Sequence, residues 1–310
     1  MTMSRTALVT GSNGFIGSHL VEKLADEGFD VRCMLRKTSD QRWINGVTKN
    51  CVYADFTDFE TLKEAVEGAD EIYHLGGTVR TVHSRKFYEI NSLGTHNIAE
   101  AVRRFNPNIS RFVYVSSQAA WGPSGNGPVS HYGKSKRDGE KWVKGTPGWS
   151  IVRPGAVYGP RDRDFLQVFK MATKGVFLKP CGAGLLSFIH VDDCVSGIIN
   201  APPNKETFLC DGRSYRWEQV ASALSNAVGR RVRCIYVPGV LLKAFGAAGT
   251  AAGMISGCPA VVNADKAREM LAGDWVIPGP YRKVRYDLSE GFRDTFEWYK
   301  RNGWLREELI

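Results

Sequence analysis

The sequence predicts an α/β protein, with a doubly wound parallel sheet followed by a smaller C-terminal α/β lobe. Three observations predict this fold. Short apolar runs alternate with amphipathic segments through the first half of the chain, glycines recur between the first strand and helix, and the alternation loosens after residue 160. Strands that alternate with helices need crossover connections, and such connections place the strands in parallel.

The expected elements follow one another in a regular order. TALVTG at 6–11 is typical of a strand, and residues 15–28 of a helix closed by glycine. The same patterns predict strands at 30–35, 71–76, 111–117 and 149–159, and helices at 56–69, 86–105 and 131–145. Further helices are expected around 215–228 and 289–301, among short strands and turns.

Composition indicates a globular protein without a metal centre. The chain has 310 residues, of which 43% are hydrophobic and 24% are charged. No apolar stretch with a small-residue cleavage site opens the chain, so we expect no signal peptide and a cytoplasmic protein. The seven cysteines are dispersed without CxxC spacing, and the six histidines lack ligand spacing. This usage suits a reducing compartment and argues against disulfides or zinc.

The formal net charge of +9 is compatible with nucleic acid, an anionic membrane surface or an anionic cofactor. The chain has no long block of basic residues and no aromatic–basic interleaving of the kind that single-strand binders use. We therefore expect no nucleic-acid partner. A solvated basic surface that also attracts phosphorylated ligands is the simpler interpretation.

Gly11, Gly14 and Gly17 form a GxxGxxG pattern between the first predicted strand and helix. Glycine is suited to a tight turn, to a close approach of backbone N–H groups to a pyrophosphate, and to close helix–strand packing. The helix N-terminus then faces the phosphates with partial positive charge. This context predicts a dinucleotide site, to which the intervening side chains Asn13, Phe15 and Ile16 also contribute.

The end of the second strand bears on the choice of cofactor. Leu35 stands where NAD enzymes place a carboxylate for the adenosine ribose, and Arg36 and Lys37 follow it. A guanidinium suits a ribose 2′-phosphate through bidentate pairing and through stacking on adenine. A merely solvated basic strand end is the alternative. Because the glycine pattern before it already predicts a dinucleotide site, we interpret the basic pair as a preference for NADP(H) over NAD(H).

Tyr132 and Lys136 lie four residues apart in HYGKSK, on one face of a predicted helix. A phenol titrates near pH 10, and a lysine ammonium one turn along favours the phenolate and lowers that pKa. Ser117 ends the preceding predicted strand, where its hydroxyl can donate to a substrate oxygen. The YxxxK spacing alone means little. Its order after the glycines and the serine makes Ser117, Tyr132 and Lys136 the candidate catalytic set.

These motifs together resemble a known family. TGSNGFIG, ADFTD, HLGG, NSLGTHNIAEA, FVYVSSQAAWG, YGKSK, IVRPGAVYGP and FIHVDD occur in the order seen in extended short-chain dehydrogenase/reductases, the NAD-dependent epimerase/dehydratase group. The resemblance runs from residue 6 to about residue 230. It implies a Rossmann-type dinucleotide-binding domain over 1–160 and about 187–202, and a substrate-binding lobe over 161–186 and 203–310.

The resemblance also implies roles for individual residues. Lys136 would hold the nicotinamide ribose as well as act on Tyr132, and Asn91 would support the central helix. The family usually forms homodimers through the helices expected at 86–105 and 131–145. The remaining cofactor contacts that the resemblance implies are Asp55 and Phe56 beside the adenine, Leu75, Gly76 and Gly77 along the cofactor, and Pro154, Gly155 and Val157 beside the nicotinamide.

Two substrate classes are open within this resemblance. The first is a nucleotide-diphosphate sugar, acted on by an epimerase, dehydratase or sugar reductase. The second is a small or lipophilic ketone or secondary alcohol, as in dihydroflavonol reductases and 3β-hydroxysteroid dehydrogenases. A non-catalytic nucleotide sensor is a third class, which the complete Ser–Tyr–Lys set disfavours.

Three features favour the second class. Leu186, preceded by Leu185, stands where sugar-nucleotide members often carry a diphosphate-binding arginine, and leucine offers no donor. Gly155 and Ala156 occupy the place where those members tend to have an asparagine. The apolar segment 237–257 predicts a lid or pocket wall, or else a buried helix pair. Its lysine and glycines argue against a membrane span. Arg161, Arg163 and Lys179 stay open as phosphate ligands.

The segment between Ser117 and Tyr132 departs from the family pattern. Only fourteen residues separate the two, whereas the family usually has a longer loop, often with acidic residues. Trp121 replaces the tyrosine that is common there, and either lines the substrate or simply packs. The short loop puts any substrate taken over from the family in doubt.

Overall fold

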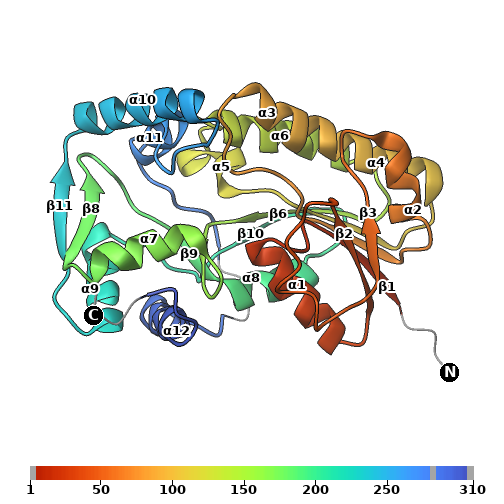
Figure 1. Cartoon of the computed structure of the whole chain (residues 1–310), viewed down its shortest axis with the longest axis horizontal. Helices are drawn as coiled ribbons and strands as arrows, with labels where there is room; N and C mark the ends of the chain where they lie inside the picture. The colour runs from red at the N-terminus through yellow and green to blue at the C-terminus, as the bar shows by residue number, and fades with distance from the viewer. Residues whose placement is uncertain (1–4, 280–283, 306–310) are drawn as a thin grey trace. The chain divides into compact units, whose positions relative to one another are not determined.

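The computed structural model describes residues 5–279 and 284–305 (Figure 1). A seven-stranded sheet with the order β10-β6-β5-β4-β1-β2-β3 forms the centre of the fold. β1 pairs in parallel with β2 and β4, β2 with β3, β4 with β5, and β5 with β6. Chain order therefore reverses beside β1, which is the arrangement of a doubly wound dinucleotide-binding sheet. The predicted α/β class is confirmed.

The strands of this sheet are short and mostly buried. Their apolar runs face helices on both sides, as parallel strands require. The strands are β1 (Thr6–Thr10), β2 (Asp30–Leu35), β3 (Cys51–Tyr53), β4 (Glu71–His74), β5 (Arg111–Val115), β6 (Trp149–Pro154) and β10 (Lys205–Leu209).

Helices lie against both faces of the sheet. Figure 1 shows α2, α4 and α6 along one face and α1 on the other. On the first face, Ile98 of α4 and Val143 of α6 join sheet residues such as Phe112 in one apolar core. The helices around the sheet are α1 (Phe15–Asp26), α2 (Leu62–Val66), α3 (Arg85–Phe87), a π-helix at Tyr88–Leu93, α4 (Gly94–Phe105), α5 (Gln118–Trp121), α6 (His131–Val143) and α8 (Val191–Ile199), with single 3-10 turns at Phe59–Thr61 and Pro123–Gly125.

Contacts divide the chain into two compact units. Unit 1 comprises residues 1–120, 131–153 and 195–207, and unit 2 comprises residues 121–130, 154–194 and 208–310. The sequence places three segments with the dinucleotide-binding domain that the contacts group with unit 2: 121–130, 154–160 and 187–194. Conversely, residues 203–207 were expected in the substrate lobe and group with unit 1. The chain thus passes between the units several times, which a division by composition alone does not detect.

Unit 2 is built around an aromatic core. Phe292 of α12 is fully buried, and its ring makes edge contacts with Tyr158, Phe169 and Phe188. Helix α9 packs against α12 beside this cluster. The elements are the parallel pairs β7 (Ala156–Tyr158) with β9 (Phe188–His190) and β8 (Val176–Pro180) with β11 (Arg233–Val237), and the helices α7 (Arg163–Ala172), α9 (Trp217–Val228), α10 (Gly239–Ser256), α11 (Ala264–Met270) and α12 (Leu288–Arg301).

Three strand predictions need correction, and the first is that the predicted strand 71–76 ends at His74. The predicted strand 149–159 is two strands in different sheets, because the chain turns at Gly155, whose N–H donates to the Leu209 carbonyl. A Cβ at Gly155 would lie 2.8 Å from the Ser187 carbonyl oxygen, so the turn depends on glycine. The predicted strand 111–117 ends at Val115, which leaves Ser117 in the connection to α5.

The apolar segment 237–257 forms one helix, α10, and not a buried pair. Its buried residues are Leu242, Gly246 and Gly253, while most of its other side chains are exposed. Within the described residues, α10 is the one helix long and apolar enough to cross a bilayer by length and composition. The sequence expectation of no membrane span stays a prediction.

Candidate active site

The glycine pattern forms a tight turn between β1 and α1. Gly11 has φ +65°, in the left-handed region that favours glycine, and its carbonyl accepts from the Gly14 N–H at 3.0 Å. A Cβ at Gly11 would lie 2.9 Å from the Gly76 nitrogen, and one at Gly17 would overlap the Gly11 carbonyl. Side chains at these positions would fill the turn, so the local geometry requires glycine.

The start of α1 fits the pyrophosphate of a dinucleotide. Gly14 is the N-cap residue and no side chain caps the helix, which has no acidic residue in its first turn. Backbone N–H groups and the helix dipole are thus directed at a ligand without competing negative charge. Asn13 donates through Nδ2 to the Asp40 carbonyl at 3.1 Å, which ties the turn to the segment after β2.

The end of β2 presents exposed cations. Leu35 is buried, and Arg36 and Lys37 directly after it are exposed. The Arg36 backbone N–H donates to the Ser39 hydroxyl at 3.1 Å, which shapes this turn. Hydrogen bonds from Thr57 lower the pKa of Asp55, and the Arg36 charge contributes to the same shift. Arg36 therefore lies within electrostatic reach of Asp55, as a shared adenosine site requires.

The predicted cofactor residues after β4 lie close to the glycine turn. The N–H of Leu75 donates to the Thr10 carbonyl at 3.3 Å, and that of Gly76 to the Thr10 hydroxyl at 3.0 Å. The Phe56 ring lies against Gly76, so closely that a Cβ there would overlap it. A Cβ at Gly77 would lie 2.9 Å from Asn91 Oδ1. The two glycines let this connection pass between its neighbours.

A buried polar chain, which we call the His74 chain, links the glycine turn to α4. His74 Nδ1 lies 2.8 Å from the Thr10 hydroxyl oxygen, and Nε2 lies 3.1 Å from that of Thr95. The Thr95 hydroxyl donates to the Asn91 carbonyl at 2.7 Å. Burial lowers the pKa of His74 to about 3, with a further contribution from the Lys136 charge, so the imidazole is neutral near pH 7.

Asn91 joins this chain to the helix that carries Tyr132. Its Oδ1 accepts from the Thr78 N–H at 2.7 Å, and its Nδ2 donates to the Ser135 hydroxyl at 3.0 Å. Ser135 in turn donates to the Tyr132 carbonyl at 2.8 Å. The side chain of Asn91 thus bridges the connection after β4 to the first turns of α6.

Lys136 is buried on α6 with its ammonium directed toward β5. Its Nζ donates to the Val115 carbonyl at 2.8 Å and lies 4.2 Å from the centre of the Tyr114 ring. Burial lowers the pKa of Lys136 to about 7, and the Glu140 carboxylate opposes that shift. The lysine therefore exchanges its proton close to neutrality.

Ser117 lies just after β5, to which Lys136 donates, and Tyr132 lies near the start of α6, the helix that carries Lys136. Ser117 comes two residues after β5, and its Oγ accepts from the Ala119 N–H at 3.0 Å. Tyr132 is half-buried in the first turn of α6, with its ring centre 6.0 Å from that of Phe87. Tyr132 and Lys136 share a helix face because four residues separate them. All three residues belong to unit 1.

Sequence reasoning missed a buried ion pair one turn beyond Lys136. Glu140 accepts from Arg153 Nε at 2.7 Å and from Nη2 at 2.6 Å, and it also accepts from the Ser116 hydroxyl at 2.6 Å. Glu206 pairs with the same guanidinium at 2.7 Å. The spacing of Glu140 from Lys136, four residues on the same helix face, was the signal that could have identified it. The ion pair ties α6 to β6 beneath the lysine.

The predicted nicotinamide-flanking residues belong to unit 2 and are held by backbone contacts. Pro154 ends β6, and the Ala156 N–H donates to the Ser187 carbonyl at 3.0 Å. Val157 pairs with Ile189 in the β7–β9 ladder. These residues follow directly on β6 of unit 1, so the chain itself carries them from one unit to the next.

The residues that bear on the substrate class also lie in unit 2. Leu186 forms backbone bridges to Tyr215 and Trp275, and its side chain packs against the aromatic core. Lys179 pairs with Glu218 at 2.7 Å. Arg161 has a left-handed backbone with φ +71°, and Arg163 begins α7 with an exposed side chain.

The short loop after Ser117 is fastened within unit 2. The Trp121 ring packs edge-on against Phe208 with ring centres 5.1 Å apart, and a Cβ at Gly125 would lie 2.8 Å from the Trp121 ring. The Ser130 hydroxyl donates to Glu269 Oε1 at 2.6 Å. Of the two roles considered for Trp121, packing is the one that these contacts describe.

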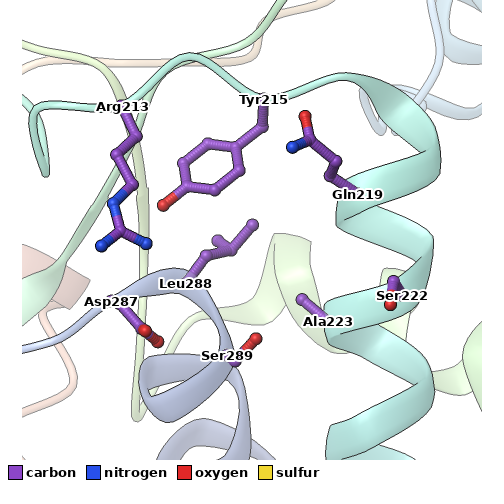
Figure 2. Close-up of a pocket in the computed structure, with 8 residues that line it drawn as sticks. All are labelled: Arg213, Tyr215, Gln219, Ser222, Ala223, Asp287, Leu288 and Ser289. Atoms are coloured by element: carbon purple, nitrogen blue, oxygen red, sulfur yellow. The ribbon is translucent and has the colours of Figure 1, made fainter.

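A cavity of about 180 Å³ lies between α9 and the start of α12 (Figure 2). Three of its polar side chains already serve local structure. Gln219 accepts from the Arg216 N–H, Asp287 caps α12, and the Tyr215 hydroxyl donates to Asp211. Ligand pockets usually measure roughly 300–1,000 Å³. We therefore assign this cavity no ligand. The residues that line it are Arg213, Tyr215, Gln219, Ser222, Ala223, Asp287, Leu288 and Ser289.

Among the described residues, no group of three or more histidine, cysteine or acidic side chains is arranged to hold a metal ion. The cysteines of this part of the chain are free thiols. Burial raises the pKa of the Cys33 thiol to about 12, which keeps it protonated. Ser117, Tyr132 and Lys136 stay the catalytic set predicted from the sequence.

The chain is similar to known proteins in sequence and in fold. The model of the NAD dependent epimerase/dehydratase family matches residues 7–208. A ceramide reductase of Caulobacter vibrioides is 30% identical over 97% of this chain and 96% of its own length. A 3-beta-hydroxysteroid dehydrogenase of Mycolicibacterium neoaurum is 27% identical over 76% of this chain and 73% of its own. The solved UDP-glucose 4-epimerase of Thermotoga maritima superposes with a TM-score of 0.72 at 18% identity, covering 96% of this chain and 99% of that one.

The chain belongs to the NAD dependent epimerase/dehydratase family. It is an NAD(P)-dependent enzyme of the extended short-chain dehydrogenase/reductase type, as the motifs predicted. The likeness to the solved epimerase shows that the fold is shared.

The neutral state of His74 leads to a prediction about stability and pH. The pKa of His74 is about 3 in the folded protein and 6.5 in an unconstrained chain, so the unfolded state binds an additional proton between these values. The stability that the neutral imidazole contributes is complete above about pH 6.5 and is lost as the pH falls. We expect wild-type stability to fall relative to that of His74→Gln, by up to about 1.4 kcal/mol per pH unit.

Urea unfolding of both proteins at several pH values from 7 to 4.5 measures this difference. His83→Gln, at an exposed histidine, controls for the loss of one imidazole. A difference in unfolding free energy between wild type and His74→Gln that stays constant with pH would contradict the prediction.

Proposed function

We propose that the protein interconverts a ketone and a secondary alcohol on a small or lipophilic substrate, with NADP(H) as its cofactor. The observation that carries the proposal is the buried Lys136 on α6, one turn from Tyr132 and bonded to the end of β5 near Ser117. A relative that matches over nearly the whole chain is named for ceramide reduction, and another for a 3β-hydroxysteroid. Both names refer to lipids.

Proton transfer falls to Tyr132. In the reductive direction its phenol donates a proton to the carbonyl oxygen, and in the oxidative direction the phenolate takes the hydroxyl proton. The ammonium of Lys136 favours the phenolate, and its own pKa of about 7 lets it pass protons near neutrality. The Ser117 hydroxyl donates to the same substrate oxygen. The bound nicotinamide supplies or accepts the hydride.

Cofactor binding falls to unit 1 in this proposal. The N–H groups around Gly11, Gly14 and Gly17 hold the pyrophosphate, and Lys136 also holds the nicotinamide ribose. Arg36 and Lys37 meet the ribose 2′-phosphate, where Leu35 offers no carboxylate to repel it. The stretch from Pro154 to Val157 is assigned to the nicotinamide from the family resemblance.

Two positions that bear on the sugar-nucleotide alternative are already occupied by contacts within the protein. Leu186 packs against an apolar core, and Lys179 is already paired with Glu218. A diphosphate needs several charge-assisted donors in one place. Arg161 and Arg163 stay open as phosphate ligands for this alternative. The homodimer through α4 and α6 and the cytoplasmic location stay predictions from the sequence.

The first prediction concerns the acid/base. Tyr132→Phe removes the phenol and keeps the ring that lies against Phe87, so folding and cofactor affinity should change little. We expect turnover to fall by roughly a hundredfold or more. Steady-state rates, with cofactor binding measured in parallel, test this expectation. A variant that keeps nearly the wild-type rate would exclude Tyr132 as the acid/base.

The second prediction concerns the cofactor. A bidentate guanidinium–phosphate contact is worth on the order of 1.5–3 kcal/mol, or about ten- to a hundredfold in affinity. Arg36→Ala should therefore weaken NADPH binding by that factor and leave NADH binding nearly unchanged. Titration of both cofactors into wild type and variant measures it. Equal dissociation constants of NADPH and NADH for the wild type would show the preference to be wrong.

The third prediction separates the two substrate classes. UDP-, GDP- and dTDP-sugars at millimolar concentration should give no thermal stabilisation, whereas a hydrophobic ketone or secondary alcohol should support NADP-linked turnover. A ligand at a hundred times its Kd adds about 2.7 kcal/mol to stability, which a melting experiment detects. A rise of several degrees with a nucleotide sugar would instead make Arg161, Arg163 or Lys179 the phosphate ligands and the protein an epimerase, dehydratase or sugar reductase.

A further inference from the structure

Helix α10 carries an exposed apolar surface, which we call the α10 face. Its large side chains are more than half exposed to solvent at three positions: Ile255 by 89%, Val240 by 78% and Phe245 by 62%. At about 100° per residue, the exposed apolar side chains cover about half of the helix circumference. The face consists of Val240, Leu241, Ala244, Phe245, Ala247, Ala248, Ala251, Ala252, Met254 and Ile255.

The opposite side of α10 is fixed to α11, which Figure 1 shows beside it. Gly246 approaches α11 so closely that a Cβ would lie 2.8 Å from that of Ala267. The Thr250 hydroxyl accepts from the Ala264 N–H at 3.0 Å. These contacts use the small and polar residues of α10 and hold it along the surface of unit 2. A helix that crossed a bilayer would have to give them up.

The stretch of sequence that contains α10 carries positive charge only. From Gln219 to Ala264 the sequence contains four basic residues, Arg230, Arg231, Arg233 and Lys243, and no aspartate or glutamate. All four are exposed. Lys243 lies on α10 at the border of the face, and Arg233 lies in β11, which leads into the helix. The carboxylates of α11 form ion pairs with cations of α11 itself.

We propose that the α10 face docks the protein on the surface of an anionic lipid bilayer, with α10 lying in the interface. Apolar area of this extent marks an interaction surface, and an interfacial helix inserts such a face among the acyl chains while flanking cations meet the head groups. Lysine at the border keeps its stem in the apolar layer and its ammonium in the polar one. A second copy of the chain fits less well, because it brings the same positive charge to the contact.

This docking does not depend on the substrate class proposed above, since it rests on α10 and its surroundings alone. The test therefore measures binding and not turnover. Purified full-length protein is mixed with vesicles of phosphatidylcholine, or of phosphatidylcholine with added phosphatidylglycerol, and the bound fraction is separated by flotation. We expect binding to the anionic vesicles to exceed binding to the neutral ones.

Variants of the face give the quantitative result. Phe245→Ser and Ile255→Ser each remove a side chain that the bilayer would bury, so each should weaken partitioning about tenfold. Lys243→Gln should weaken binding to anionic vesicles about fivefold and leave binding to neutral ones unchanged. Circular dichroism and thermal melting of each variant verify its fold, which exposed positions should tolerate.

Leu241 and Leu93 form a matched control pair. Both leucines are 50% exposed, but Leu93 lies in unit 1, away from α10 in the sequence. Leu241→Ser should weaken vesicle binding and Leu93→Ser should not, compared at a protein concentration at which light scattering gives both variants the oligomeric state of the wild type. Absence of wild-type binding to anionic vesicles would overturn the proposal, as would equal losses in the two leucine variants. Light scattering that shows a dimer dissociated by Phe245→Ser would make the face a contact between copies instead.

Discussion

The His74 chain is the interaction on which the geometry of unit 1 depends. It connects the carboxyl ends of β1 and β4 to α4, and Asn91 extends it to α6. Each of these groups is buried, so a missing partner would leave a polar atom without solvent or hydrogen bond, at a cost of about 1–3 kcal/mol. The His74 chain therefore fixes the distance between the glycine turn and the helix that carries Tyr132. Because burial holds His74 neutral, it makes this connection without a charge.

Close backbone approach is the second constraint, and it acts at the same edge of the sheet. Gly11, Gly17 and Gly76 are packed so that a side chain on any one would strike its neighbours. Parallel strands bring their carboxyl ends to one edge, and a reversal in strand order opens a crevice there for a ligand. One turn from Lys136, the buried ion pair between Glu140 and Arg153 connects α6 to β6. The lysine thus occupies a fixed position, from which its charge acts on Tyr132 in the proposed mechanism.

Unit 2 distributes its apolar side chains in two opposite ways. The aromatic core around Phe292 buries its rings, whereas α10 of the same unit turns Phe245 and Ile255 outward. An exposed face of this kind lowers solubility unless something covers it. Docking on a bilayer covers it, and it would place unit 2 at the phase in which lipophilic ketones and alcohols are dissolved. The proposed substrate class and the proposed surface therefore agree in their chemistry while resting on different residues.

The sequence alone determined the α/β class, the glycine turn and the order of Ser117, Tyr132 and Lys136, because period, turn chemistry and spacing are local properties. It did not determine where the segment 149–159 breaks, since the turn at Gly155 depends on Ser187 and Leu209, far along the chain. Sequence reasoning missed four buried residues for the same reason, because their partners come from different strands and helices. These residues are His74, Thr95, Glu140 and Arg153. Only the tertiary structure decided whether 237–257 is core or surface. Apolar composition is identical in both cases, and burial is set by what packs against it.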